Sequence, residues 1–189
     1  MKNTSVRKIT GVAILLAIEM VFQALAPLIP TQVNINLSLI PIAVGAIVYG
    51  PLAGAFLGLG NGIFVILTDG FFMPFAPWGT ILVCVLKCTI AGLVAGLVFK
   101  LISKKNRVVA SVVASLLIPI INTGIFAAGC FTVLKPAIDY HYSNPDVVRY
   151  VFLALIGWNF IFEFSVTTAL APTITKIMKI MTRTDKHAL

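Results

Sequence analysis

The chain has 189 residues, of which 59% are hydrophobic and only 11% are charged. Soluble globular domains carry about 25% charged residues, so this composition excludes a soluble domain and leaves room for one membrane domain without a separate catalytic one. The formal net charge is +8, but the basic residues form short clusters between apolar segments, a pattern that sets membrane topology and does not indicate nucleic-acid binding.

Apolar runs predict six membrane-spanning helices and therefore an all-α integral membrane protein. A helix that crosses a bilayer needs about 20 predominantly apolar residues, and two shorter runs are joined by the turn Gly50-Pro51, which predicts a closely packed or partly re-entrant pair. Within a single membrane domain of residues 1–189, the predicted spans cover residues 9–29, 37–49, 52–67, 78–102, 108–134 and 150–171, followed by a cytoplasmic tail at 172–189.

The first apolar run also has the composition of a signal peptide. Glu19 interrupts it, however, and Pro27 would directly follow the cleavage site at Ala26. We therefore expect it to be retained as the first helix.

Basic residues predict the orientation of the six spans. They lie before the first span, between the fourth and fifth, and after the sixth, so six spans place all three clusters on the same side of the membrane. The positive-inside rule then predicts that both termini are cytoplasmic. The clusters are Lys2, Arg7 and Lys8; Lys100, Lys104, Lys105 and Arg107; and Lys176, Lys179, Arg183 and Lys186.

Polar side chains within the apolar runs are the main functional signal. Such side chains are costly in hydrocarbon and usually face a protein-lined cavity or a partner. They are Glu19, Gln23, Asn61, Lys87, Asn122, Asn159 and Glu163. At a rise of about 1.5 Å per residue, all except Glu163 fall between the midplane and the outer leaflet. The sequence therefore predicts a polar pocket that binds a small polar molecule, although Asn and Gln also join helices to one another.

Charge within the spans is unbalanced. Lys87 is the one base, whereas Glu19 and Glu163 are two acids. A proton or a ligand must therefore compensate the remaining charge. We expect Lys87 to line the pocket, and Glu19, Gln23 and Glu163 to act as proton or charge partners. Proton-carrying acids also leave open a self-sufficient secondary transporter, although no inverted repeat is visible.

The fifth predicted span carries a second pocket signal. Pro119 lies three residues before Asn122, and a proline kink frees backbone carbonyl groups that a cavity can use. By helical spacing, Phe126 shares the face of Asn122. These residues are expected to contact the ligand.

Loop residues extend the expected site. Asn34 and Asn36 alternate with apolar residues after the first span, which is typical either of a solvated loop or of an extended lid over a pocket. Trp78 and Trp158 lie in the outer half, where tryptophan is commonly an interfacial anchor but also offers a surface on which a ligand stacks.

No residue pattern predicts catalysis or metal binding. Cys84, Cys88 and Cys130 lie in apolar segments and are interpreted as small packing residues. The two histidines, His141 and His187, lie outside the spans, and Walker, zinc-protease and serine-hydrolase motifs are absent. We therefore expect no catalytic residue, no metal and no cofactor on this chain, and any ATP must be hydrolysed by partner subunits.

Small residues mark a second surface on the first span. Ala13 and Ala17 are one turn apart, and Glu19 and Gln23 point roughly 120° away from them. Such a smooth face allows another helix to approach closely.

The whole chain resembles the substrate-binding S components of energy-coupling factor (ECF) vitamin transporters. The resemblance rests on six spans, on Ala13-x-x-x-Ala17, on the stretch Val48–Gly54 and on the segment Asn34–Pro41. It implies that Ala13 and Ala17 contact a transmembrane coupling (T) subunit driven by two cytoplasmic ATPases, in the bacterial cytoplasmic membrane. It also implies a vitamin pocket near the outer surface, capped by the loop after the first span.

The pantothenate-type S components are the most similar. This resemblance lies in Pro119–Gly124, Gly157–Phe160 and Glu163. Lys87 suits the carboxylate of pantothenate, and Asn side chains suit its hydroxyl and amide groups. Riboflavin, folate, pyridoxine and a hydroxymethylpyrimidine are the alternative substrates. The expected substrate-binding residues are Asn34, Asn36, Asn61, Trp78, Lys87, Asn122, Phe126, Trp158 and Asn159.

Overall fold

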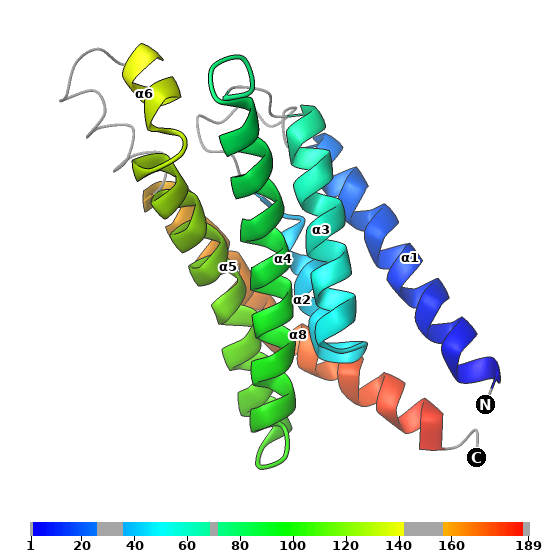
Figure 1. Ribbon diagram of the computed structural model, residues 1–189. Helices are drawn as coiled ribbons and strands as arrows, with labels where there is room; N and C mark the ends of the chain where they lie inside the picture. The colour runs from blue at the N-terminus through cyan, green and yellow to red at the C-terminus, as the bar shows by residue number, and fades with distance from the viewer. Residues whose placement is uncertain (1, 26–35, 69–71, 142–156, 187–189) are drawn as a thin grey trace.

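The computed structural model describes residues 2–25, 36–68, 72–141 and 157–186, and among these every regular element is a helix. The helices are arranged as one bundle (Figure 1). They are α1 (Lys2–Leu25), α2 (Leu39–Val48), α3 (Pro51–Thr68), α4 (Pro77–Ile102), α5 (Arg107–Phe131), α6 (Lys135–His141) and α8 (Trp158–Lys186).

Four helical segments are long and apolar enough to cross a membrane. They are Val6–Leu25, Pro51–Thr68, Pro77–Ile102 and Arg107–Phe131. Two shorter apolar helices accompany them, Leu39–Val48 and Phe160–Ile174. These six segments correspond in order to the six predicted spans, although the two shorter ones fall below the length that a full crossing needs.

Several boundaries differ from those expected from the sequence. The fifth helix ends at Phe131, and α6 follows where a loop was expected. The last helix does not end near residue 171 but continues through Pro172 to Lys186. A proline removes one backbone hydrogen bond, which weakens a helix without necessarily ending it. The segments at 26–35 and 142–156, which include parts of the first and sixth predicted spans, lie outside the described residues.

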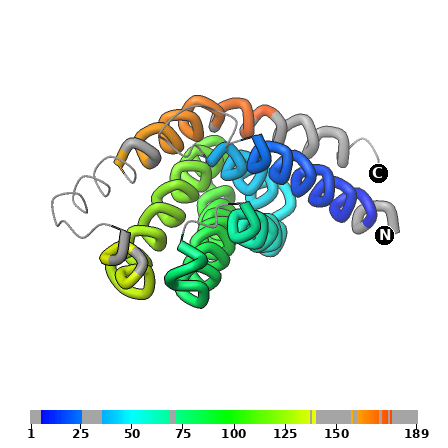
Figure 2. The backbone as a smooth tube through the Cα atoms, turned by 90° about the horizontal axis from the view of Figure 1, so that it is seen from above, coloured from blue at the N-terminus to red at the C-terminus, as the bar shows by residue number. Residues whose placement is uncertain are grey.

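The short helix α2 lies at the centre of the bundle. It contacts α1, α3, α4, α5 and α8, whereas α4 packs mainly between α3 and α5. Viewed from above, α8 and α4 lie on opposite sides of the bundle, with α2 between them (Figure 2). Although α2 has only ten residues, it therefore contacts helices on several sides of the core.

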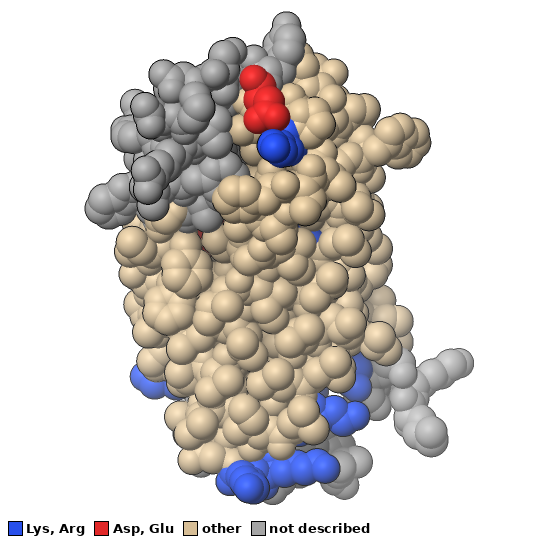
Figure 3. Space-filling model, turned by 60° about the vertical axis from the view of Figure 1, so that its left-hand side comes forward, with Lys and Arg blue, Asp and Glu red and all other residues tan. Residues whose placement is uncertain are grey.

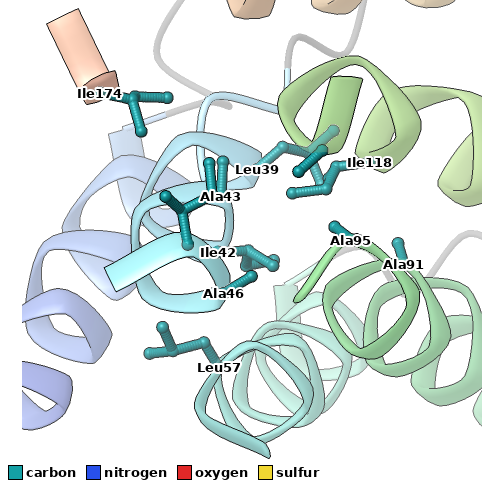
Figure 4. Close-up of a cluster of buried hydrophobic side chains, with 11 residues drawn as sticks. Leu39, Ile42, Ala43, Ala46, Leu57, Ala91, Ala95, Ile118 and Ile174 are labelled. Atoms are coloured by element: carbon teal, nitrogen blue, oxygen red, sulfur yellow. The ribbon is translucent and has the colours of Figure 1, made fainter. Parts of the chain in front are cut away.

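The hydrophobic core forms around α2 (Figure 4). Leu39, Ile42, Ala43 and Ala46 of α2 are almost completely buried. The side chains that surround them come from four other helices, and include Leu57, Ala91, Ala95, Ala114, Ile118 and Ile174. The many alanines in this cluster allow neighbouring helices to approach α2 closely.

Three glycines one turn apart on α3 bring its backbone directly against α4. A Cβ atom added at Gly54 would lie 2.6 Å from the carbonyl oxygen of Gly92, and one at Gly62 would lie 2.7 Å from that of Cys84. At Gly58, between them, it would overlap the carbonyl group of Cys88. Only glycine fits such backbone contact. The four-residue spacing of these glycines therefore fixes the register of α3 on α4.

The turn between α2 and α3 also depends on glycine. Gly50 has a φ of 102°, a conformation that L side chains rarely adopt. Pro51 then begins α3. A backbone N–H group at this position would make no intrahelical hydrogen bond, so proline costs the helix none there. The Gly50-Pro51 pair therefore reverses the chain within a single turn.

Exposed charges gather at the two ends of an apolar surface (Figure 3). The beginning of α1, the α4–α5 connection and the end of α8 all lie at one end of the bundle (Figure 1). Exposed basic residues at that end are Arg7, Lys8, Lys100, Lys104, Lys105 and Arg107. Lys135 and Asp139 are exposed on α6 at the opposite end.

Candidate functional site

A buried polar cluster is centred on Ser38, directly before α2. Its hydroxyl oxygen lies 3.2 Å from Gln23 Oε1 and 3.0 Å from Asn61 Oδ1. It also lies within hydrogen-bonding distance of Asn36 Oδ1. Ser38 is completely buried. One hydroxyl group therefore joins α1, α3 and the segment that leads into α2.

The cluster continues across α4 to α5 through a thiol. Asn61 Nδ2 donates to Cys88 Sγ, and Cys88 Sγ donates to Asn122 Oδ1, each over 3.5 Å. We call the connected residues the polar network: Gln23, Asn36, Ser38, Asn61, Cys88 and Asn122. Such groups interact strongly in the low dielectric of a bundle interior, so the network holds four helices and the α2 entry in one arrangement.

A cationic group lies beside this network. Lys87 is half-buried, and its Nζ atom lies 4.9 Å from the centroid of the Phe126 ring, within cation–π range. Phe126 also packs against Phe72, with ring centroids 6.4 Å apart. Lys87 acts electrostatically on the carboxylate of Glu163, which also accepts a hydrogen bond from the backbone of Asn36. Lys87 of α4 thus lies against α5, and its charge acts on a carboxylate of α8.

Two carboxylates are buried in the bundle. Glu19 is 1% exposed and Glu163 is 7% exposed. Among the described residues, neither oxygen of Glu19 has a hydrogen-bond partner, and the same holds for Oε2 of Glu163. Burying a charged group is costly unless it is paired, so each carboxylate requires a proton, a cation or a ligand group as its counterpart.

The structure brings together most of the predicted polar residues. Gln23, Asn36, Asn61 and Asn122 belong to the polar network, and Lys87 lies against Phe126 and faces Glu163. Trp78 is not part of this cluster. Its side chain is 83% exposed at the start of α4, a position suited to an interfacial anchor. Asn34 and the side chains of Trp158 and Asn159 lie outside the described part of the structure.

The two alanines predicted as a partner surface are exposed. Ala13 and Ala17 lie on the outside of α1, whereas Glu19 and Gln23 of the same helix are buried. Helix α1 therefore presents small residues outward and polar residues inward.

Sequence reasoning missed two members of the polar network, Ser38 and Cys88. Cys88 was interpreted as a small packing residue because cysteine is common in cores. The sequence signal that could have identified Cys88 was the glycine spacing of α3. Gly58 and Gly62 flank Asn61 and require backbone contact with α4, which places Asn61 beside Cys88. Ser38 lies two residues after Asn36 at the entry to α2, where a hydroxyl group reaches neighbouring segments.

Transition-metal ligands do not gather in the described residues. No group of three His, Cys, Asp or Glu side chains is found there. The three cysteines are buried as free thiols.

Comparison with protein-family models identifies the family. The model of the ECF transporter substrate-specific component matches residues 7–181, nearly the whole chain. A search of curated proteins gave no match, and a search of solved structures gave none. The family match agrees with the helical bundle and with the four helices, among the described residues, that are long and apolar enough to cross a membrane. This multi-pass membrane protein therefore belongs to the family of ECF transporter substrate-specific components.

Proposed function

We propose that this chain is the pantothenate-binding subunit of an ATP-driven ECF importer. Members of its family bind a small-molecule substrate and work with a T subunit and ATPase subunits. The observation that carries the substrate proposal is the position of Lys87. It is half-buried on α4, directly before Cys88 of the polar network, and its Nζ atom lies over the ring of Phe126.

The chemical groups of pantothenate suit this arrangement. Pantothenate has a carboxylate, an amide and two hydroxyl groups on a small flexible skeleton. Lys87 supplies a positive charge for the carboxylate. The side-chain amide of Asn122 both donates and accepts hydrogen bonds, as an amide or a hydroxyl group requires. Phe126 offers an apolar surface for the methyl groups. Asn34, Trp158 and Asn159 are proposed to complete the site from the neighbouring segments.

Riboflavin is the second candidate substrate. The observation that favours it is the aromatic pair Phe72 and Phe126, whose rings lie 6.4 Å apart next to Lys87. A flat ring system would stack on such a pair. Folate, pyridoxine and hydroxymethylpyrimidine are further candidates, and competition between vitamins separates all five.

For the membrane arrangement, we propose six spans with both termini in the cytoplasm. The three basic chain segments at one end of the bundle support this orientation through the positive-inside rule (Figure 1). On this proposal, Ala13 and Ala17 face the T subunit, and two cytoplasmic ATPases drive transport. Trp78 anchors the outer end of α4 at the membrane interface.

Uptake of labelled pantothenate by cells that express this chain tests the proposal. We expect uptake only when a T subunit and ATPase subunits are co-expressed, and we expect unlabelled pantothenate alone among the five vitamins to compete. Uptake by the chain alone, driven by a proton gradient, would instead support a secondary transporter in which Glu19 and Glu163 carry protons. Competition by riboflavin alone would support the second substrate.

A further inference from the structure

The hydrogen bonds of Ser38 leave an excess of oxygen atoms at one point. A serine hydroxyl carries a single hydrogen and therefore donates to one acceptor at a time. The Ser38 hydroxyl nevertheless faces three amide oxygens, those of Gln23, Asn36 and Asn61. Four oxygens thus converge from three segments of the chain, and a single hydrogen cannot satisfy them.

A buried carboxylate lies one turn of α1 before the oxygen of Gln23. Glu19 lies one turn before Gln23 on the same buried face of α1, which packs against α2 and α3. It is 1% exposed, and neither carboxylate oxygen has a partner among the described residues. Its charge also acts on the Cys88 thiol of α4. The carboxylate is therefore directed into the bundle, toward the polar network.

We propose that Glu19 and the oxygens of Gln23, Asn36, Ser38 and Asn61 form a binding site for one Na⁺ ion. Hard cations prefer carboxylate, carbonyl and hydroxyl oxygens. A monovalent ion neutralises the single carboxylate of this group, whereas a divalent ion would leave a net positive charge in an apolar bundle. The charge of Lys87 acts on the other buried acid, Glu163.

Among monovalent cations, Na⁺ requires a smaller opening of this oxygen cluster than K⁺ does. Na⁺ and Ca²⁺ are nearly equal in size, and cations of this size hold oxygen at about 2.3–2.6 Å, so adjacent ligands of an octahedron lie about 3.3–3.7 Å apart. The oxygens of Gln23 and Asn61 lie 3.2 Å and 3.0 Å from that of Ser38. All three contacts of the Ser38 oxygen, including the shorter one with Asn36, must therefore widen to admit Na⁺, and the larger K⁺ requires a still wider opening.

This site would be separate from the proposed vitamin site but connected to it through Asn36. The side chain of Asn36 belongs to the oxygen cluster, and its backbone hydrogen-bonds to Glu163, which faces Lys87. Binding of Na⁺ fixes Asn36 and so favours the arrangement that holds the substrate. The proposal does not depend on which vitamin binds.

Thermal unfolding of the purified full-length chain in detergent, without vitamin, tests the site. The three buried cysteines allow a thiol-reactive dye to report unfolding. NaCl is titrated against N-methyl-D-glucamine chloride at constant ionic strength, with KCl and CaCl₂ as separate arms. Because Na⁺ binds only the folded state, we expect a saturable rise in Tm of about 3–6 °C at ten times the Kd, and no such rise with K⁺.

Two substitutions locate the effect. Glu19→Gln removes the charge while keeping the shape, and it should abolish the Na⁺-dependent rise without lowering the Tm measured in N-methyl-D-glucamine. Asp139→Asn, the matched change at an exposed position of α6, should leave the rise intact. Equal Tm values in Na⁺ and N-methyl-D-glucamine for the unmodified chain would overturn the proposal. So would a rise that survives Glu19→Gln, or one produced equally by K⁺. Vitamin binding is measured separately, so failure of this site leaves the substrate proposal unaffected.

Discussion

At the scale of single residues, the proposed function depends on a few polar side chains in an apolar bundle. Lys87, over Phe126 and facing Glu163, supplies the charge that we assign to substrate binding. Ser38 holds the neighbouring amides in place through one hydroxyl group. Residues with these two proposed roles should respond differently to substitution, because one would contact the ligand and the other would fix the geometry around it.

Substitutions of Lys87 distinguish the contribution of its charge to substrate affinity from the contribution of its packing. Lys87→Ala removes the group that pairs with the carboxylate of pantothenate, so affinity should fall by about tenfold or more, which corresponds to about 1.4 kcal/mol or more. Lys87→Arg keeps the positive charge, so its affinity for pantothenate should fall less than that of Lys87→Ala. Equilibrium binding of labelled pantothenate measures both variants. Unchanged affinity in Lys87→Ala would remove Lys87 from the site.

Removing the hydroxyl of Ser38 tests the centre of the polar network. Ser38→Ala removes the one hydroxyl hydrogen that these buried amide oxygens share, which should lower the free energy of unfolding by about 1–3 kcal/mol. Thr68→Ala is the control, because Thr68 is exposed and its hydroxyl bonds only to the carbonyl oxygen of Phe64 in its own helix. Thermal unfolding in detergent compares the two. Equal stability of the two variants would show that the network around Ser38 is not structurally required.

At the scale of elements, the close contact of α3 with α4 places the network. Gly54, Gly58 and Gly62 bring the two backbones together, and the same contact sets Asn61 against Cys88. Helix α2 then closes the core from the centre of the bundle. The position of the polar residues is therefore a consequence of glycine spacing.

A single methyl group at Gly58 should disturb this contact. Its Cβ atom would overlap the carbonyl group of Cys88, so Gly58→Ala should destabilise the protein by about 1–3 kcal/mol and weaken substrate binding. Gly124→Ala on α5 is the matched control, because among the described residues no atom beyond its own stretch of α5 lies within 4 Å of the added Cβ. Thermal unfolding and equilibrium binding check both. Wild-type behaviour of Gly58→Ala would mean that α3 and α4 are not held by backbone contact.

Hydropathy predicted the order of the apolar helices well, because long apolar runs have few alternatives to membrane helices. The polar residues within those runs were equally visible, and Gln23, Asn61 and Asn122 do converge. Ser38 and Cys88 were missed because their role comes from neighbours on other helices, which no local pattern records. The end of α8 was also misplaced, because Pro172 is accommodated within the helix.

At the scale of the whole molecule, the proposed function gives the two faces of α1 separate roles. Glu19 and Gln23 are buried in the bundle, whereas Ala13 and Ala17 are exposed on its surface. The family assignment supplies a T subunit as the natural partner of an exposed helix face. Binding and transport should therefore be separable by substitution.

Bulky residues on the outer face of α1 should block transport and spare binding. Ala13→Trp combined with Ala17→Trp prevents close approach of a partner helix, so uptake should be lost while the purified chain retains its affinity for pantothenate. Leu67→Trp, on the exposed face of α3, is the control and should leave both activities intact. Loss of both binding and uptake in the double variant would indicate an internal packing role instead.

The most direct test of the account is calorimetric titration of the purified chain alone with pantothenate. We predict saturable binding of one vitamin per chain at submicromolar concentration, without T or ATPase subunits, and no comparable response to riboflavin, folate, pyridoxine or hydroxymethylpyrimidine. Saturable binding of one of these other vitamins, with no response to pantothenate, would contradict the substrate assignment and would leave only the family role standing.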